Sequence, residues 1–317
     1  MPEDQGVNGD RWTEQASSLL NAFGWTKIAD SNIDIEGADG LQHGIDALFK
    51  YKDGFKPIKD QGVFLEAKTY ATSSFRPQKL NDWVSKIDNK IRELKLSQEF
   101  NERYPRISVS NAANGLLMIW FHDKDNYRGF LPTFKEAMLN VRTPRKRGSN
   151  LLPIRLFLLE NNAILRLASL KEEIEKWENE SSNQGSKINF YYPSSAKHGY
   201  AIQEIPVLNL EYFFSKFILA KAIEQTDQGS KTTDIVFYFG SLDIHSFFRL
   251  KQALLSYDMI SSNNKLILYT YKREDSTFRK IRPDVEQLFR KEEGPLEFSI
   301  KQMTILGDLP PWMTSEG

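Results

Sequence analysis

The stretch from residue 44 to residue 70 constrains the fold of this chain more than any other part of the sequence. Two strand-like runs, residues 44–51 and 62–70, flank a connection that contains the turn-forming pair Asp53-Gly54. The second run opens with Val63, Phe64 and Leu65, and such continuous apolarity is typical of a strand buried on both faces. The stretch therefore predicts a β-hairpin inside a buried sheet.

Three charged residues stand at informative positions in this hairpin. Alternate residues of a strand share a face, so Glu66 and Lys68 are expected to point the same way. If the two runs pair, Asp46 comes beside Glu66. Two carboxylates can hold a hard cation such as Mg²⁺. The cation polarises a phosphate and lowers the pKa of a water, and an amine stabilises the negative charge that develops during the reaction. The pattern indicates a metal-dependent phosphodiesterase site.

The pattern resembles the PD-(D/E)xK nuclease superfamily, in which an aspartate is followed, after a strand and a turn, by Glu-x-Lys. The matching residues are Asp46, Glu66 and Lys68, and Ile45 stands where the superfamily usually has proline. Upstream, residues 10–25 are similar to the first helix of the branch that contains Mrr and the archaeal Holliday-junction resolvases. The resemblance covers residues 10–122.

The resemblance implies an α/β fold, with a restriction-endonuclease-like mixed sheet flanked by helices. It implies that Asp46 and Glu66 bind Mg²⁺ or Mn²⁺, with Glu14 as a further ligand, and that Lys68 orients or activates the attacking water or stabilises the pentavalent phosphorus. The implied function is a DNA endonuclease acting as a bacterial restriction or anti-phage defence effector. The alternatives are a structure-specific DNA repair or recombination nuclease and a catalytically decayed nuclease fold that binds a partner.

Each of these residues also has an interpretation without chemistry. Glu66 and Lys68 could form a solvated pair that adds little to stability, although the apolar run before them argues against full exposure. Glu14 lies in the first turn of the expected helix, where an acid also complements the helix dipole. The sequence leaves the metal role of Glu14 open.

The positive charge of the chain is informative only where it is concentrated. The net charge is zero, with 42 basic and 42 acidic residues, yet a nuclease must gather positive charge where it grips phosphates. Such a cluster stands at Arg142, Arg145, Lys146 and Arg147, in a segment that is either a phosphate contact or a solvated loop. The resemblance favours DNA over RNA. The neutral net charge suggests that the chain alone binds DNA weakly. We therefore expect additional DNA contacts from a partner protein, such as an ATPase or sensor, or from a homo-oligomer.

Composition excludes several other kinds of site. The chain has no cysteine, which excludes disulfides, thiolate metal sites and cysteine nucleophiles and is typical of a reducing compartment. The four histidines are far apart in sequence, which argues against zinc. No signal peptide or membrane-spanning run is evident, so the expected location is cytoplasmic, without a membrane partner.

The length of 317 residues predicts two domains or one core with a large extension. We expect a nuclease domain over residues 1–180, a polar linker over 178–187 and a C-terminal α/β domain of unknown role over 187–317. Within them, apolar spacing predicts one long helix over residues 78–102 and an apolar helix over 208–224. Strand-like and helix-like runs alternate from residue 235 onward, which predicts parallel strands.

Overall fold

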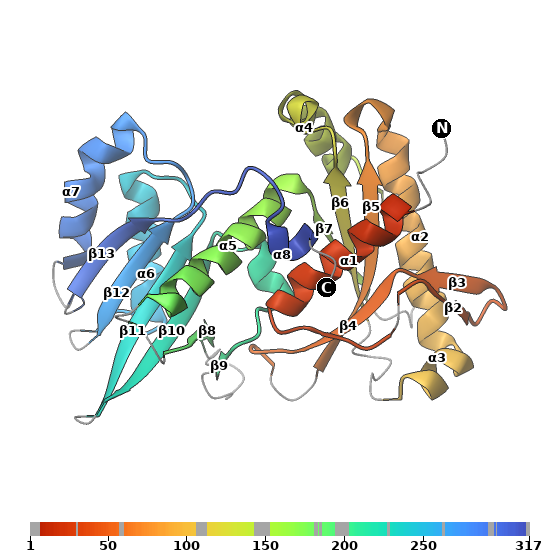
Figure 1. The fold of residues 1–317 in the computed structure, drawn as a ribbon, viewed down its shortest axis with the longest axis horizontal. Coiled ribbons are helices and arrows are strands. Elements are labelled where there is room, and N and C mark those ends of the chain that lie inside the picture. The colour runs from red at the N-terminus through yellow and green to blue at the C-terminus, as the bar shows by residue number, and fades with distance from the viewer. Residues whose placement is uncertain are drawn as a thin grey trace. The chain divides into compact units, whose positions relative to one another are not determined.

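A computed structural model describes residues 7–29, 31–56, 60–105, 113–142, 153–180, 183, 186–193, 203–226, 229–261, 264–290, 295 and 297–314 (Figure 1). The chain forms two compact units. The first contains residues 1–52, 59–164 and 311–317, and the second contains residues 53–58 and 165–310. This division falls at residue 164, whereas the domain boundary expected near residues 180–187 stays a prediction.

The first unit is built on a five-stranded mixed sheet, which confirms the expected fold class. The strand order is β1-β4-β5-β6-β7; β4 pairs antiparallel with β1 and β5, whereas β5, β6 and β7 run parallel. The five strands are β1 (Thr26–Lys27), β4 (Ala47–Lys52), β5 (Asp60–Tyr70), β6 (Asn114–Phe121) and β7 (Arg155–Leu159). A separate two-stranded sheet pairs β2 (Ile33–Glu36) with β3 (Gln42–Ile45).

Helices cover both faces of this sheet because both faces are apolar. Alternate residues of β6 point to opposite faces. Trp120 stacks on Trp12 of α1 (Val7–Ala22) at a ring-centroid distance of 5.7 Å. Leu117 and Phe121, on the other face, share a buried cluster with α2 (Pro77–Leu96) and α4 (Lys124–Leu139). The short elements η1 (Thr72–Ser74) and α8 (Pro311–Thr314) complete the described part of this unit.

The long helix expected over residues 78–102 is interrupted at Ser97. The α2 helix ends there, and α3 (Gln98–Arg103) begins with the Ser97 side chain accepting a hydrogen bond from Phe100 N at 3.1 Å. The Ser97 hydroxyl also donates to Glu36 O at 2.5 Å. A serine that caps a new helix breaks the old one, and apolar spacing alone does not reveal such a break.

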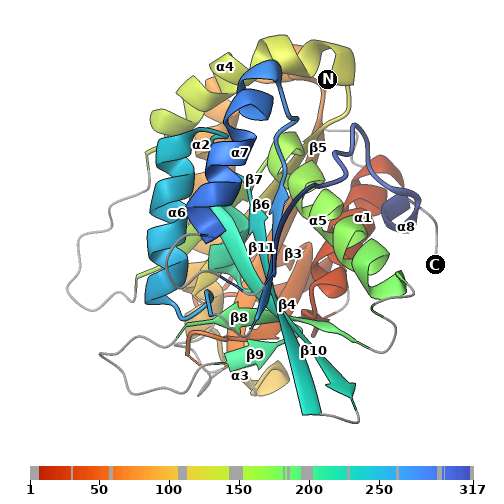
Figure 2. The ribbon, with the colours of Figure 1, turned by 90° about the vertical axis from the view of Figure 1, so that its left-hand side faces the viewer.

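The second unit is a six-stranded sheet of order β13-β12-β11-β10-β8-β9, in which β11, β12 and β13 run parallel, as the alternating pattern predicted. Figure 2 shows α6 and α7 side by side, and their buried side chains form one cluster with β11, β12 and β13. The helix α5 begins in the first unit, and most of its length belongs to the second. The elements are α5 (Asn161–Asn179), β8 (Ile188–Tyr192), β9 (Gln203–Ile205), η3 (Leu210–Phe214), β10 (Phe217–Thr226), β11 (Gly229–Tyr238), α6 (Ile244–Ser256), β12 (Lys265–Thr270), α7 (Ser276–Arg290) and β13 (Glu297–Gln302).

The helix expected over residues 208–224 is wrong. The segment folds as the short 3₁₀ helix η3 followed by the strand β10, which pairs antiparallel with β11 on one side and β8 on the other. The strand opens with the continuous apolar run Phe217, Ile218, Leu219 and Ala220, of which the last three residues are buried. Such a run cannot be distinguished from a buried helix by periodicity alone.

A buried ion pair joins two strands of the second unit. Asp234 of β11 is fully buried; its Oδ1 lies 3.6 Å from Lys221 Nζ, and its Oδ2 accepts a hydrogen bond from Asn264 at 2.9 Å. The Lys221 ammonium also lies 4.5 Å from the ring centroid of Tyr191. Burial raises the pKa of Asp234 from 3.8 to about 6, although Lys221 acts in the opposite direction.

This pair predicts a pH dependence of stability. The folded pKa of Asp234 exceeds the unfolded value, so its contribution to the free energy of unfolding is fully present below pH 3.8 and is lost as the pH rises through about 6. We expect Asp234→Asn to lose this dependence. Its free energy of unfolding should therefore rise relative to that of the native chain by about 2 kcal/mol between pH 4 and pH 7. Urea denaturation at several pH values measures the difference. Asp284→Asn, an exposed substitution on α7, should track the native chain, and a pH-independent difference for Asp234→Asn would contradict the prediction.

No helix in the described part of the chain is both long enough and apolar enough to cross a membrane.

Candidate active site

The β4–β5 hairpin brings Asp46 and Glu66 together. Ala47 is in register with Leu65, so Asp46, one residue earlier, falls opposite Glu66. Asp46 occupies the bend where the chain leaves the β2–β3 pair and enters the main sheet, and its carbonyl accepts a hydrogen bond from Asn32 N at 3.2 Å. The side-chain Oδ2 of Asp46 accepts a second hydrogen bond, from Ala67 N, at 2.8 Å. The bond from Ala67 N fixes the carboxylate of Asp46 against the β5 strand.

Lys68 lies on the same face of β5 as Glu66. Its Nζ is 2.9 Å from Glu66 Oε1 and 3.7 Å from Asp46 Oδ2, so one ammonium reaches both acids. The Phe64 side chain, two residues before Glu66, packs in the core cluster that contains Ile87 and Ile91 of α2. By the two-residue alternation, Glu66 and Lys68 therefore face α2.

A second lysine, Lys90 of α2, completes the cluster. Its Nζ lies 2.5 Å from Glu66 Oε2, and its side chain is only 13% exposed. Sequence reasoning missed this residue because its partner is 24 positions away on another element. One signal in the sequence could have indicated it. Lys90 directly precedes Ile91, and Ile87 and Ile91 belong to the apolar face of the helix, so a lysine at this position lies close to the buried face.

The cluster holds its two acids in different electrostatic states. Burial, followed by the nearby charge of Glu66, raises the pKa of Asp46 above its usual value, against the opposing effect of Lys68 and Lys90. Burial also acts to raise the pKa of Glu66, but Lys90 and Lys68 outweigh it and hold that pKa below its usual value. Close carboxylates whose protonation equilibria are pushed apart are frequent in functional sites.

The acids fit a divalent cation of the Mg²⁺ type. Among the described residues, no group of three acidic or histidine side chains is placed to hold a metal ion. Mg²⁺ is usually bound through only one or two carboxylates, with waters and substrate phosphates supplying its other ligands. Asp46, from the bend before β4, and Glu66, from β5, are both largely buried and provide that donor set.

Glu14 has other contacts. Its Oε1 accepts hydrogen bonds from Ser31 Oγ at 2.5 Å and Lys27 Nζ at 3.2 Å, and its side chain is 61% exposed. The Ser31 hydrogen bond, opposed by partial burial and aided by Lys27, lowers the pKa of Glu14. The contacts with Ser31 and Lys27 support a structural role, and its role as a metal ligand stays a proposal.

The basic segment after α4 is described only at its start. Arg142 is exposed, and its backbone N–H donates to Asn81 Oδ1 of α2 at 3.0 Å. Arg145, Lys146 and Arg147 lie outside the described residues. The proposed phosphate contact therefore rests on the sequence. Arg142 is the one residue of the four whose position the structure describes.

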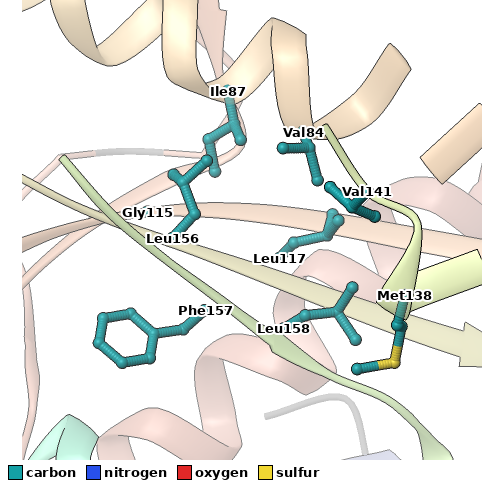
Figure 3. A pocket seen from close by; sticks show the side chains of 9 residues that line it. All are labelled: Val84, Ile87, Gly115, Leu117, Met138, Val141, Leu156, Phe157 and Leu158. Atoms are coloured by element: carbon teal, nitrogen blue, oxygen red, sulfur yellow. The ribbon is translucent and has the colours of Figure 1, made fainter. Parts of the chain in front are cut away.

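An apolar hollow of ≈ 170 Å³ lies in the first unit, and Figure 3 shows the side chains that surround it. Its lining residues come from α2, β6, β7, the end of α4 and the segment directly after α4, and none carries a charge or a side-chain hydrogen-bonding group. They are Val84, Ile87, Gly115, Leu117, Met138, Val141, Leu156, Phe157 and Leu158. The hollow offers no group for acid–base or metal chemistry, so we place the candidate site at the hairpin.

The mixed sheet of the first unit is consistent with the fold of a PD-(D/E)xK nuclease, and a family match confirms the superfamily resemblance. Residues 1–163 match the family model described as the GAPS4 protein PD-(D/E)XK nuclease domain. The chain belongs to this GAPS4 family. No curated protein matches the chain. Nuclease domains bind nucleic acid, and this class generally uses divalent metal ions.

Proposed function

We propose that the chain is a Mg²⁺- or Mn²⁺-dependent DNA endonuclease that serves as a bacterial restriction or anti-phage effector. The observation that carries the proposal is the convergence of Asp46, Glu66 and Lys68 on one face of a nuclease-type sheet, with distances of 2.9 and 3.7 Å from the ammonium to the two acids. Membership of the GAPS4 nuclease family supports the same chemistry.

The residues divide the work of phosphodiester hydrolysis. Asp46 and Glu66 supply carboxylate oxygens for the cation, and the Ala67 N–H fixes the orientation of Asp46. A divalent ion held there polarises the phosphate and lowers the pKa of a bound water. Lys68, placed between the acids, orients the attacking water or stabilises the charge that develops on the phosphate oxygens.

A substrate comparison tests the proposal. The full chain is incubated with Mg²⁺ and closed circular DNA, linear duplex, a four-way junction, single-stranded DNA or RNA. Cutting of closed circles, which have no ends, is expected and would demonstrate endonuclease activity. Cleavage confined to the junction would favour the repair alternative, whereas cleavage of RNA alone would contradict the DNA assignment.

The basic segment gives a second, independent prediction. If it contacts phosphates, replacing its four cations with alanine weakens binding to all DNA sequences about equally. The slope of log affinity against log salt then flattens by about 0.9 for each lost contact on duplex. Cleavage per bound complex stays almost unchanged, because phosphate contacts position the substrate. The four residues are Arg142, Arg145, Lys146 and Arg147.

The second unit offers a control with the same charge change. Three exposed arginines and one exposed lysine on α6 and α7 match the composition of the basic segment: Arg249, Arg279, Lys280 and Arg290. Their replacement should leave the salt slope unaltered. An equal change in both quadruple variants, or no change in either, would leave the basic segment without a phosphate role.

A further inference from the structure

Both oxygens of Glu66 are occupied by ammonium groups. Lys68 Nζ lies 2.9 Å from Oε1, and Lys90 Nζ lies 2.5 Å from Oε2. Lys68 also reaches Asp46, at 3.7 Å, whereas the described ion pair of Lys90 is with Glu66. Each oxygen of this carboxylate, which is to ligate a metal ion, is therefore already in contact with an ammonium group.

The Lys90 contact is built into the fold. Ile87 and Ile91, on either side of Lys90 in α2, are almost completely buried in the core, so the helix cannot rotate to release the lysine. Lysine is usually exposed, and a buried ammonium needs a compensating charge. Lys86, one helical turn earlier, is exposed in the ordinary way. The inward direction of Lys90 is therefore not shared by Lys86 of the same helix.

The cluster is balanced as it stands. Asp46 and Glu66 carry two negative charges when ionised, and Lys68 and Lys90 carry two positive charges. Adding a divalent cation while both lysines remain would leave an excess of two positive charges among largely buried groups, which is unfavourable. One ammonium must therefore withdraw. The flexible stem of a lysine permits such a withdrawal without movement of α2.

We propose that Lys90 is a positioning residue that competes with the divalent cation for Glu66 and so sets the metal affinity of the site. The inference rests on the proposed function, because it takes Asp46 and Glu66 as the metal-binding acids. Lys68, which lies between both acids, remains in place for the reaction. Metal enters only by displacing the Lys90 ammonium from Glu66 Oε2.

Mn²⁺ binding to the full chain tests this competition without any cleavage. The bound ion is measured by the loss of the electron paramagnetic resonance signal of free Mn²⁺. We expect Lys90→Met to bind Mn²⁺ at least about tenfold more tightly than the native chain, because opposite charges at this separation interact strongly even at the effective dielectric of a protein surface. Lys86→Met, which removes the same charge from the same helix, should change the affinity far less.

Two further variants separate the possible failures. Lys90→Arg keeps the charge and should keep the native affinity, and Lys90→Gln serves as a neutral variant if thermal melting shows that Lys90→Met is unfolded. One outcome would overturn only the competition: Asp46→Asn loses Mn²⁺ binding, but the neutral Lys90 variants bind Mn²⁺ with the same affinity as the native chain. The proposed function would then remain intact. Undiminished binding in Asp46→Asn would instead overturn the metal site itself.

Discussion

Asparagine in place of Asp46 is expected to lower the rate of DNA cleavage by roughly a thousandfold or more. A metal ion supplies several kcal/mol of transition-state stabilisation, and each 1.36 kcal/mol corresponds to a factor of ten in rate. Glu66→Gln should cause a loss of the same order, because it removes the other carboxylate. Cleavage time courses in Mg²⁺ measure both effects.

The two variants should differ in stability at neutral pH. Burial and then Glu66 raise the pKa of Asp46, so the folded chain disfavours its charge; Asn removes that charge and keeps the acceptor for the Ala67 N–H. Asp46→Asn should therefore melt at the same temperature as the native chain or higher. The pKa of Glu66 is lowered, because Lys90 and Lys68 outweigh the effect of burial. Its charge contributes stability above the unfolded pKa, which is lost as the pH falls, so Glu66→Gln should melt lower at neutral pH.

Asp60→Asn provides a matched control for both measurements. Asp60 lies at the start of β5, is half-exposed and forms a surface pair with Lys50 at 3.6 Å. Exposed pairs of this kind contribute little to stability, so activity and melting temperature should stay close to those of the native chain. Full cleavage activity in Asp46→Asn or Glu66→Gln would contradict the assignment of the acids.

Lys68→Met is expected to reduce the turnover number by at least about a hundredfold while hardly changing DNA affinity. Methionine keeps most of the side-chain stem and removes the ammonium that lies between Asp46 and Glu66. Stabilisation of charge that develops only in the transition state acts on turnover and leaves ground-state binding untouched. Single-turnover kinetics and binding titrations, run on the same preparations, separate the two quantities.

Lys50→Met, on the neighbouring strand β4, is the control for Lys68. Lys50 is partly exposed and pairs with Asp60, so its loss should change neither turnover nor affinity by more than about twofold. The opposite pattern in Lys68→Met, normal turnover with weakened binding, would place Lys68 in the binding groove and outside the chemistry.

The hairpin geometry could be predicted because it depends on local rules. Two-residue alternation placed Glu66 and Lys68 on one face, and the turn after Lys52 implied pairing that set Asp46 opposite Glu66; the register of Ala47 with Leu65 agrees with this. Alternation of strands and helices likewise indicated the parallel strands β11, β12 and β13.

Contacts between distant elements could not be predicted in this way. Lys90 belongs to a helix with many charged residues, and nothing in its local sequence states that its ammonium reaches Glu66. The sequence of β10 predicted a helix because the continuous apolar run at its start fits a buried helix as well as a buried strand. Both errors concern tertiary burial, which overrides local pattern.

The central claim is that Asp46 and Glu66 form a divalent-metal site for phosphodiester hydrolysis. The most direct measurement is nicking of supercoiled plasmid by the purified full chain across a Mg²⁺ titration, with and without chelator, alongside Asp46→Asn. The account predicts nicked product that rises with Mg²⁺, disappears with chelator, returns when Mg²⁺ is restored and is lost in the variant. Nicking that persists in chelator, or that is equal in Asp46→Asn, would contradict it.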